Sequence, residues 1–110
     1  MGYYQGTGDE WAKAVEGAES APSKTDGIDT GGRATARVIA EGTFDTATLS
    51  VYIRSDANGP LQLYDTYELT SGETYQLDVS TWATVGIAAR ITTLTGDGAK
   101  VRRRVRLSEV

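Results

Sequence analysis

The sequence predicts an all-β protein, an antiparallel β-sandwich or partly closed barrel of about six to seven strands, with an extended N-terminal arm. Two observations carry this prediction. From Arg33 onward, apolar and polar residues alternate with a period of two, which is typical of half-buried strands. The alternating segments are joined by short turns containing Gly, Asn or Asp, with no helical segment between them. A parallel βαβ arrangement is therefore excluded.

Residues 1–32 are predicted to form a flexible arm, because they are rich in glycine and polar residues and lack a sustained apolar period. A short helix is expected over 9–19, since Asp9 can cap it and apolar residues recur at helical spacing. Gly17 and the short length make such a helix marginal on its own. The β-sandwich domain is expected to span 33–110.

The clearest strand is 46–54, in which alternate residues form one apolar face: Ala47, Leu49, Val51 and Ile53. The preceding strand is expected over 33–41, followed by a turn at Gly42. The next strand runs from about 61 to 69, and its alternation is interrupted at Asp65. This interruption predicts a break or a bulge in the strand.

Three further strands complete the predicted domain. Alternating runs occupy 75–79 and 82–94, and a final run occupies 99–107. The dipeptide Asp97-Gly98 favours a hairpin turn, because both residues tolerate positive φ. The last strand is therefore expected to pair antiparallel with the strand that precedes it.

The composition argues against catalysis. The chain contains no cysteine and no histidine, so thiolate nucleophiles, imidazole bases and zinc sites with these ligands are excluded. The acidic residues that can approach one another lack a spacing that defines an acid–base pair or a calcium site: Asp56, Asp65, Glu68 and Asp78. We therefore expect no catalytic residues, no metal site and no cofactor, and the protein is not expected to be an enzyme.

No apolar run approaches the roughly 20 residues that a membrane-spanning helix requires, and the N-terminal residues lack the basic and apolar pattern of a secretory signal, so none is expected. Membrane contact is not expected. The absence of cysteine does not indicate a cellular compartment.

Charge is distributed unevenly along the chain, whose net charge is −4. Residues 1–99 contain six cations and fourteen acids, whereas residues 100–110 contain five cations and one acid. Alternation places four of these cations on one face of the last strand: Lys100, Arg102, Arg104 and Arg106. We therefore expect a charged contact with a partner at this strand.

Three interpretations of these cations remain open. They can be a solvated edge that discourages sheet-to-sheet aggregation, or a basic surface that meets an acidic protein. They can also attract nucleic-acid phosphates, but the sequence lacks the aromatic and glycine pattern that base stacking requires, so nucleic acid is not the expected partner.

The aromatic residues form two groups of interest. The first lies in the arm, which is too polar to bury these side chains by itself: Tyr3, Tyr4 and Trp11. These residues can anchor a neighbouring subunit or fold back onto the domain. The second lies on or near the predicted strands and can either pack normally or form a stacking platform for sugars: Tyr64, Tyr67, Tyr75 and Trp82.

Two segments resemble small β-sandwich virion proteins of tailed bacteriophages. The first contains a Gly-Thr-Phe sequence leading into an Ala-Thr-Leu strand, at 42–44 and 47–49. The second contains Arg90, Ile91 and Thr92 before a glycine-containing turn, although Ala89 stands where these proteins commonly have an aromatic residue. The resemblance covers about 42–107.

This resemblance implies a capsid decoration (cement) protein or a head-fibre component, located in the virion and assembled in the host cytoplasm. It further implies a homo-oligomer, commonly a trimer, that binds the major capsid protein or another virion protein, with the arm reaching across neighbouring subunits. The alternative is a carbohydrate- or receptor-binding module that uses Tyr64, Tyr67 and Trp82.

Overall fold

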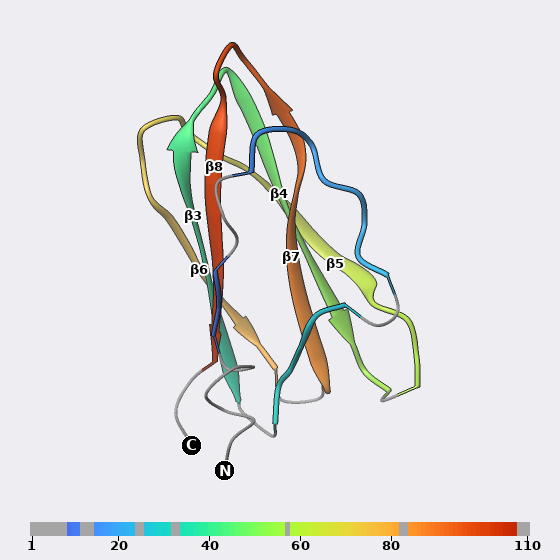
Figure 1. Ribbon diagram of the computed structural model, residues 1–110. Coiled ribbons are helices and arrows are strands. Elements are labelled where there is room, and N and C mark those ends of the chain that lie inside the picture. Colours follow the sequence, from blue (N-terminus) through green and yellow to red (C-terminus); the bar gives the residue numbers. More distant parts are fainter. Residues whose placement is uncertain are drawn as a thin grey trace.

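The computed structural model describes residues 9–11, 15–23, 26–31, 34–56, 58–81 and 84–107. These residues form two antiparallel β-sheets that lie face to face, with the arm passing in front of β7 (Figure 1). The predicted all-β sandwich is confirmed, and the described residues include no helix.

Each sheet contains four strands within the described residues. The β3–β8 sheet has the order β1-β8-β3-β6, with β1 (Asp9–Trp11), β8 (Lys100–Leu107), β3 (Thr35–Thr43) and β6 (Tyr75–Ser80). The β4–β7 sheet has the order β2-β7-β4-β5, with β2 (Ile28–Asp29), β7 (Gly86–Thr95), β4 (Thr46–Arg54) and β5 (Gln62–Glu68). From β3 to β8, every connection except the one between β4 and β5 crosses between the sheets.

The core lies between the sheets and is built from alternate residues of the central strands. Its largest fully buried apolar side chains are Val38, Leu49, Val51, Val79, Ile87, Ile91, Val101 and Val105. Burying one such side chain is worth about 1.5–3 kcal/mol, so this layer is the main source of stability. The apolar face expected for the strand 46–54 is confirmed by the burial of Ala47, Leu49 and Val51.

The predicted hairpin between the last two strands is wrong. β7 pairs with β4 and β2, whereas β8 pairs with β3 and β1, so the turn at Gly96–Gly98 joins the two sheets. A two-residue type I′ turn needs positive φ at both central residues. In the structure Gly96 and Gly98 have φ of 120° and 67°, but no described residue other than glycine has a positive φ. Asp97 therefore does not adopt the hairpin conformation.

Gly42 lies inside β3 instead of forming the expected turn. The strand continues to Thr43, and Phe44 and Asp45 make the connection to β4. Gly42 pairs with Val101, and a Cβ atom on this glycine would overlap the Lys100 carbonyl oxygen. The glycine is needed here for the close approach of β3 and β8, and not for a change in chain direction.

The irregularity expected near Asp65 is a β-bulge. Val51 pairs with Asp65 and Tyr52 pairs with Leu63, so Tyr64 has no residue opposite it on β4. The bulge lies on β5, which is an edge strand of the β4–β7 sheet within the described residues. An extra residue at such a position distorts the edge and opposes pairing with another strand.

The helix expected over 9–19 is also wrong for the described residues. Asp9–Trp11 forms β1, and Val15 makes two backbone hydrogen bonds with Val101, of 2.7 and 3.0 Å. A short segment containing Gly17 gains little from helical hydrogen bonds alone. The edges of β8 and β7 offer backbone partners instead, and the arm adds one short strand to each sheet.

Candidate docking face and arm anchor

The outward face of the β3–β8 sheet carries the cations that the sequence assigned to one side of the last strand. The inward side chains of β8 are buried, including Arg103, while Lys100, Arg102 and Arg106 are exposed and Arg104 is partly exposed. Arg37 on β3 lies exposed on the same side. We call these five residues, Arg37, Lys100, Arg102, Arg104 and Arg106, the cationic face.

The cationic face holds five of the eight Lys and Arg residues in the described part of the chain. The other three lie elsewhere, where Arg54 and Arg90 contact Asp26, and Arg103 contacts Glu19. Most of the described cations therefore lie on one sheet of a chain whose net charge is negative.

The strand register places like charges next to each other at one end of the cationic face. Arg37 lies opposite Arg106, an arrangement that disfavours sheet pairing by itself. Asp78 on β6 lies opposite Arg37 and accepts hydrogen bonds of 2.9 Å from Nε and 3.3 Å from Nη2. The hydrogen bond from Arg37 is the main reason that the pKa of Asp78 lies below its usual value. On the other side, Asp9 of β1 is the register partner of Arg106.

Two shallow hollows lie at the two ends of this face. One, of about 370 Å³, is lined by Thr35, Arg37, Ile39, Gln76, Asp78, Arg106 and Leu107. The other, of about 430 Å³, lies near Lys100 and Arg102 and is also lined by Glu41, Thr43, Glu73 and Thr74. Neither hollow is enclosed, so the geometry suits a protein surface better than a small substrate.

The structure brings together some of the predicted contact residues. Trp11 of β1 is the register partner of Arg104, so the arm borders the cationic face. Tyr3, Tyr4 and Trp82 lie outside the described residues.

The remaining tyrosines of the predicted glycan site lie on β5. Tyr67 packs against Tyr75 of β6 with ring centroids 5.6 Å apart, and burial followed by the charge of Asp65 raises the pKa of Tyr67 to about 12. Tyr64, on the bulge, is 48% exposed. Tyr67 therefore serves packing between the two edge strands, and Tyr64 is the member of this pair open to a ligand.

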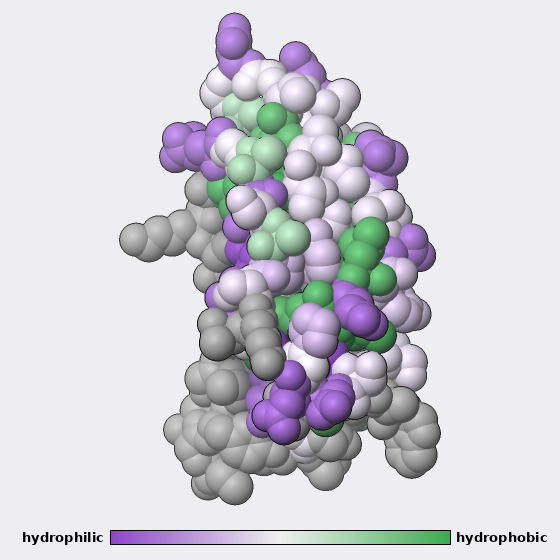
Figure 2. Space-filling view, turned by 90° about the vertical axis from the view of Figure 1, so that its right-hand side faces the viewer, coloured by the Kyte–Doolittle hydropathy of each residue, from purple (hydrophilic) through white to green (hydrophobic). Residues whose placement is uncertain are grey.

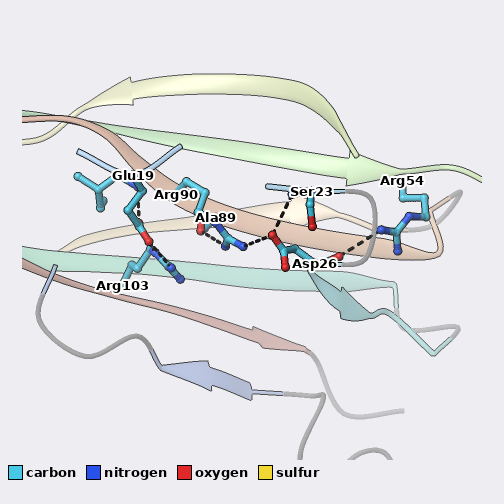
Figure 3. Close-up of polar contacts among 8 residues, drawn as sticks. Glu19, Ser23, Asp26, Arg54, Ala89, Arg90 and Arg103 are labelled. Carbon is cyan, nitrogen blue, oxygen red and sulfur yellow. Dashed lines mark hydrogen bonds and ion pairs between the residues drawn. The ribbon is translucent and has the colours of Figure 1, made fainter. Parts of the chain in front are cut away.

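An ion pair between the arm and the core was missed by the sequence analysis. The Glu19 carboxylate accepts two hydrogen bonds of 2.7 Å from Nε and Nη2 of Arg103 and one of 2.9 Å from the Ile91 N–H (Figure 3). The Glu19 N–H donates to the Ile91 carbonyl at 2.7 Å. We call this group of Glu19, Ile91 and Arg103 the arm anchor. Its only sequence signal was an arginine at an inward position of the last strand.

A second set of contacts holds the arm further along β7 (Figure 3). Asp26 forms an ion pair with Arg90 at 3.4 Å, and its carbonyl accepts a hydrogen bond of 3.1 Å from Arg54. Its carboxylate also accepts a 2.8 Å hydrogen bond from the Ser23 N–H. In addition to the backbone pairing of β1, Val15 and β2, side-chain contacts thus hold the arm at two places, of which the arm anchor is the more buried.

These observations define the class: a two-sheet antiparallel β-sandwich with an arm bound along its side and a cationic face on one sheet. The described residues contain no group of three or more His, Cys, Asp or Glu side chains placed to hold a metal ion. In the same part of the chain no helix is long and apolar enough to cross a membrane.

No protein-family model matches the chain, and no curated protein matches its sequence. The fold is similar to that of the crystal structure of SPBc2 prophage-derived protein YomS, with a TM-score of 0.61 and 14% sequence identity. The similarity covers 91% of this chain and 95% of that chain. At this level of identity the comparison establishes a shared fold.

Proposed function

We propose that the chain is a structural protein of a bacteriophage virion, specifically a capsid decoration (cement) or accessory head protein. Two features support this proposal: the fold is shared with a prophage-derived protein over nearly the whole of both chains, and the sequence resembles small virion β-sandwich proteins. The proposed role is non-enzymatic. Its mechanism is the burial of surface against other virion proteins, in copies whose contacts add through avidity.

The cationic face is the observation that carries the mechanism. Five cations on one sheet of a chain with net charge −4 form a surface complementary to an acidic protein, such as the major capsid protein. Arginine suits this contact because its planar fork binds carboxylates through two hydrogen bonds. The arm borders this face through the register pair Trp11 and Arg104. The proposed contact also includes the arm residues Tyr3, Tyr4 and Trp11.

Changing Arg102, Arg104 and Arg106 together to glutamine is expected to weaken attachment to capsids about tenfold at low salt. The measurement is co-sedimentation of the purified chain with capsids that lack it, at about 50 and 200 mM salt. Wild-type binding should fall as salt rises, and binding of the variant should depend less on salt.

A control with the same change in net charge carries aspartate at Ser55, Asn58 and Gln62, which are exposed positions on β5 and in the β4–β5 turn, outside the cationic face. It separates the effect of this face from that of net charge, and should retain most of the attachment. Equal losses in both variants, or attachment indifferent to salt and to all six changes, would contradict the proposed mechanism.

A carbohydrate- or receptor-binding module is the second candidate, and one observation favours it. Tyr64 is 48% exposed on the bulge of β5, next to Asp65, whose carboxylate is a suitable acceptor for sugar hydroxyls. Under this alternative, Tyr64→Ala removes glycan binding and leaves capsid attachment intact. If the chain binds no glycan on an array, the carbohydrate-binding alternative is ruled out.

A further inference from the structure

The sandwich carries opposite charges on two different surfaces. The cationic face lies on the β3–β8 sheet, whereas the edge strand β5 of the other sheet contains Asp65 and Glu68 and no cation. Asp56, in the turn that leads to β5, is also exposed. Two copies of the chain can therefore attract each other through unlike surfaces.

The acidic strand also presents the most exposed large apolar side chains among the described residues. Leu63 is 58% exposed and Tyr64 is 48% exposed, and they are adjacent on the bulge. Figure 2 views the molecule from the side on which β5 lies in Figure 1, and shows separate hydrophobic patches among polar surface. We call Leu63 and Tyr64 the β5 knob.

The hollow at the Arg37 end of the cationic face complements the β5 knob in its apolar lining and in the sign of its charge. Its lining includes the apolar residues Ile39 and Leu107, and its charged residues are Arg37, Asp78 and Arg106. Asp78 forms an ion pair with Arg37, so the net positive charge of the hollow comes from Arg106. The β5 knob has the reverse pattern, an apolar pair beside carboxylates. A protruding apolar group that fits a pocket elsewhere on the same molecule produces a head-to-tail contact between copies.

We propose that the β5 knob of one copy docks into the Arg37–Arg106 hollow of a second copy, with Glu68 facing Arg106. The register places Leu63 and Glu68 on one face of the sheet, opposite Tyr52 and Thr48, and Asp65 on the other face, opposite Val51. The contact is made by side chains, because the bulge and the acidic residues of β5 oppose direct pairing of edge strands. This inference rests on the proposed function, and it assigns one end of the cationic face to a second copy of the chain. The Lys100 end remains available to the capsid.

The first experiment measures self-association of the purified full-length chain by sedimentation velocity over a range of concentrations. A knob variant carries Leu63→Ser and Tyr64→Ser, and a hollow variant carries Ile39→Ser and Arg106→Glu. Each is expected to weaken self-association at least about tenfold. Matched controls, Val85→Ser for an exposed apolar residue and Lys100→Glu for a cation at the far end of β8, should associate as the wild type does.

The decisive experiment mixes the two variants in equal amounts. The knob variant retains its hollow and the hollow variant retains its knob, so the mixture should form a mixed dimer with affinity within about threefold of wild type. A contact using the same surface on both copies gives no such recovery. The proposal is overturned if the mixture stays dissociated, if neither variant weakens association, or if the wild type remains monomeric at about 1 mM.

These measurements use no other virion protein. If the wild type binds capsids but makes no head-to-tail contact, only this inference is removed. If the chain self-associates as described but does not bind capsids, the proposed capsid attachment is contradicted and the contact between copies is retained.

Discussion

Replacement of Glu19 by alanine is expected to lower the free energy of unfolding by about 3 kcal/mol, because it leaves a buried arginine without its carboxylate. The Arg103 and Glu19 side chains are only 8% and 23% exposed, and the carboxylate also holds the Ile91 N–H. A loss of this size should lower the urea midpoint by roughly 2 M in equilibrium unfolding. Glu16→Ala, at an exposed position of the same segment, is the control and should stay within about 0.5 kcal/mol of wild type.

The same variant has a defined pH signature. Burial by itself raises the pKa of Glu19, but hydrogen bonds from Arg103 and the Ile91 N–H, together with the charges of Arg103 and Arg90, lower it below 4.5. A carboxylate whose pKa is lowered by folding stabilises the protein above its unfolded pKa, and this contribution is lost as pH falls through the folded value. The stability difference between wild type and Glu19→Ala should be full at neutral pH and shrink below about pH 4.5.

Removing both charges tests the origin of the loss. The double variant Glu19→Leu/Arg103→Met should recover much of the stability, because apolar groups of similar volume replace the buried pair without an uncompensated charge. If Glu19→Ala unfolds at the wild-type midpoint, the arm anchor does not hold the arm in solution. If the double variant is as unstable as the single one, loss of the Glu19–Arg103 ion pair is not the cause of the instability.

Gly42→Ala is expected to destabilise the protein by about 3 kcal/mol, because the added methyl group has no space between β3 and β8. The new Cβ would overlap the Lys100 carbonyl oxygen and lie 2.8 Å from the Val101 Cα. Both neighbours are backbone atoms of the paired strand, so a side-chain rotation cannot relieve the contact. Thermal or chemical unfolding measures the effect, and hydrogen exchange of the β8 amides should increase.

Gly17→Ala is the matched control. Nothing lies within 4 Å of a Cβ built at Gly17, and its φ is not positive. This substitution should therefore be neutral or slightly stabilising, by at most about 1 kcal/mol. Equal stability of the two alanine variants would show that β3 and β8 separate easily at this position.

The period-two pattern was sufficient to predict the strands but not their partners. Alternation is local, and it correctly placed Leu49 and Val51 in the core. Whether the turn at Gly96–Gly98 pairs β7 with β8 or carries the chain to the other sheet depends on which edges are already occupied. β7 lies beside β4 and β8 beside β3, and these pairings connect segments distant in sequence.

The candidate site likewise contains residues that the sequence could predict and residues that it could not. The outward cations of β8 follow from alternation alone, and the sequence identified them. The arm anchor joins residues 84 positions apart, and nothing local indicates which acid of the arm meets Arg103. The arm's helical spacing was similarly misleading, because the open edges of β7 and β8 provide better backbone partners than a short isolated helix.

The path of the arm has a mechanical consequence. The arm adds β1 to one sheet and β2 to the other, and Glu19 ties it to both Ile91 and Arg103. Tension applied at the N-terminus is therefore borne first by these contacts and only afterwards by the pairing of the six longer strands. If residues 9–31 were released, they would span about 80 Å when fully extended, while the six longer strands remain folded. Under tension the arm would therefore detach and extend before the sandwich unfolds.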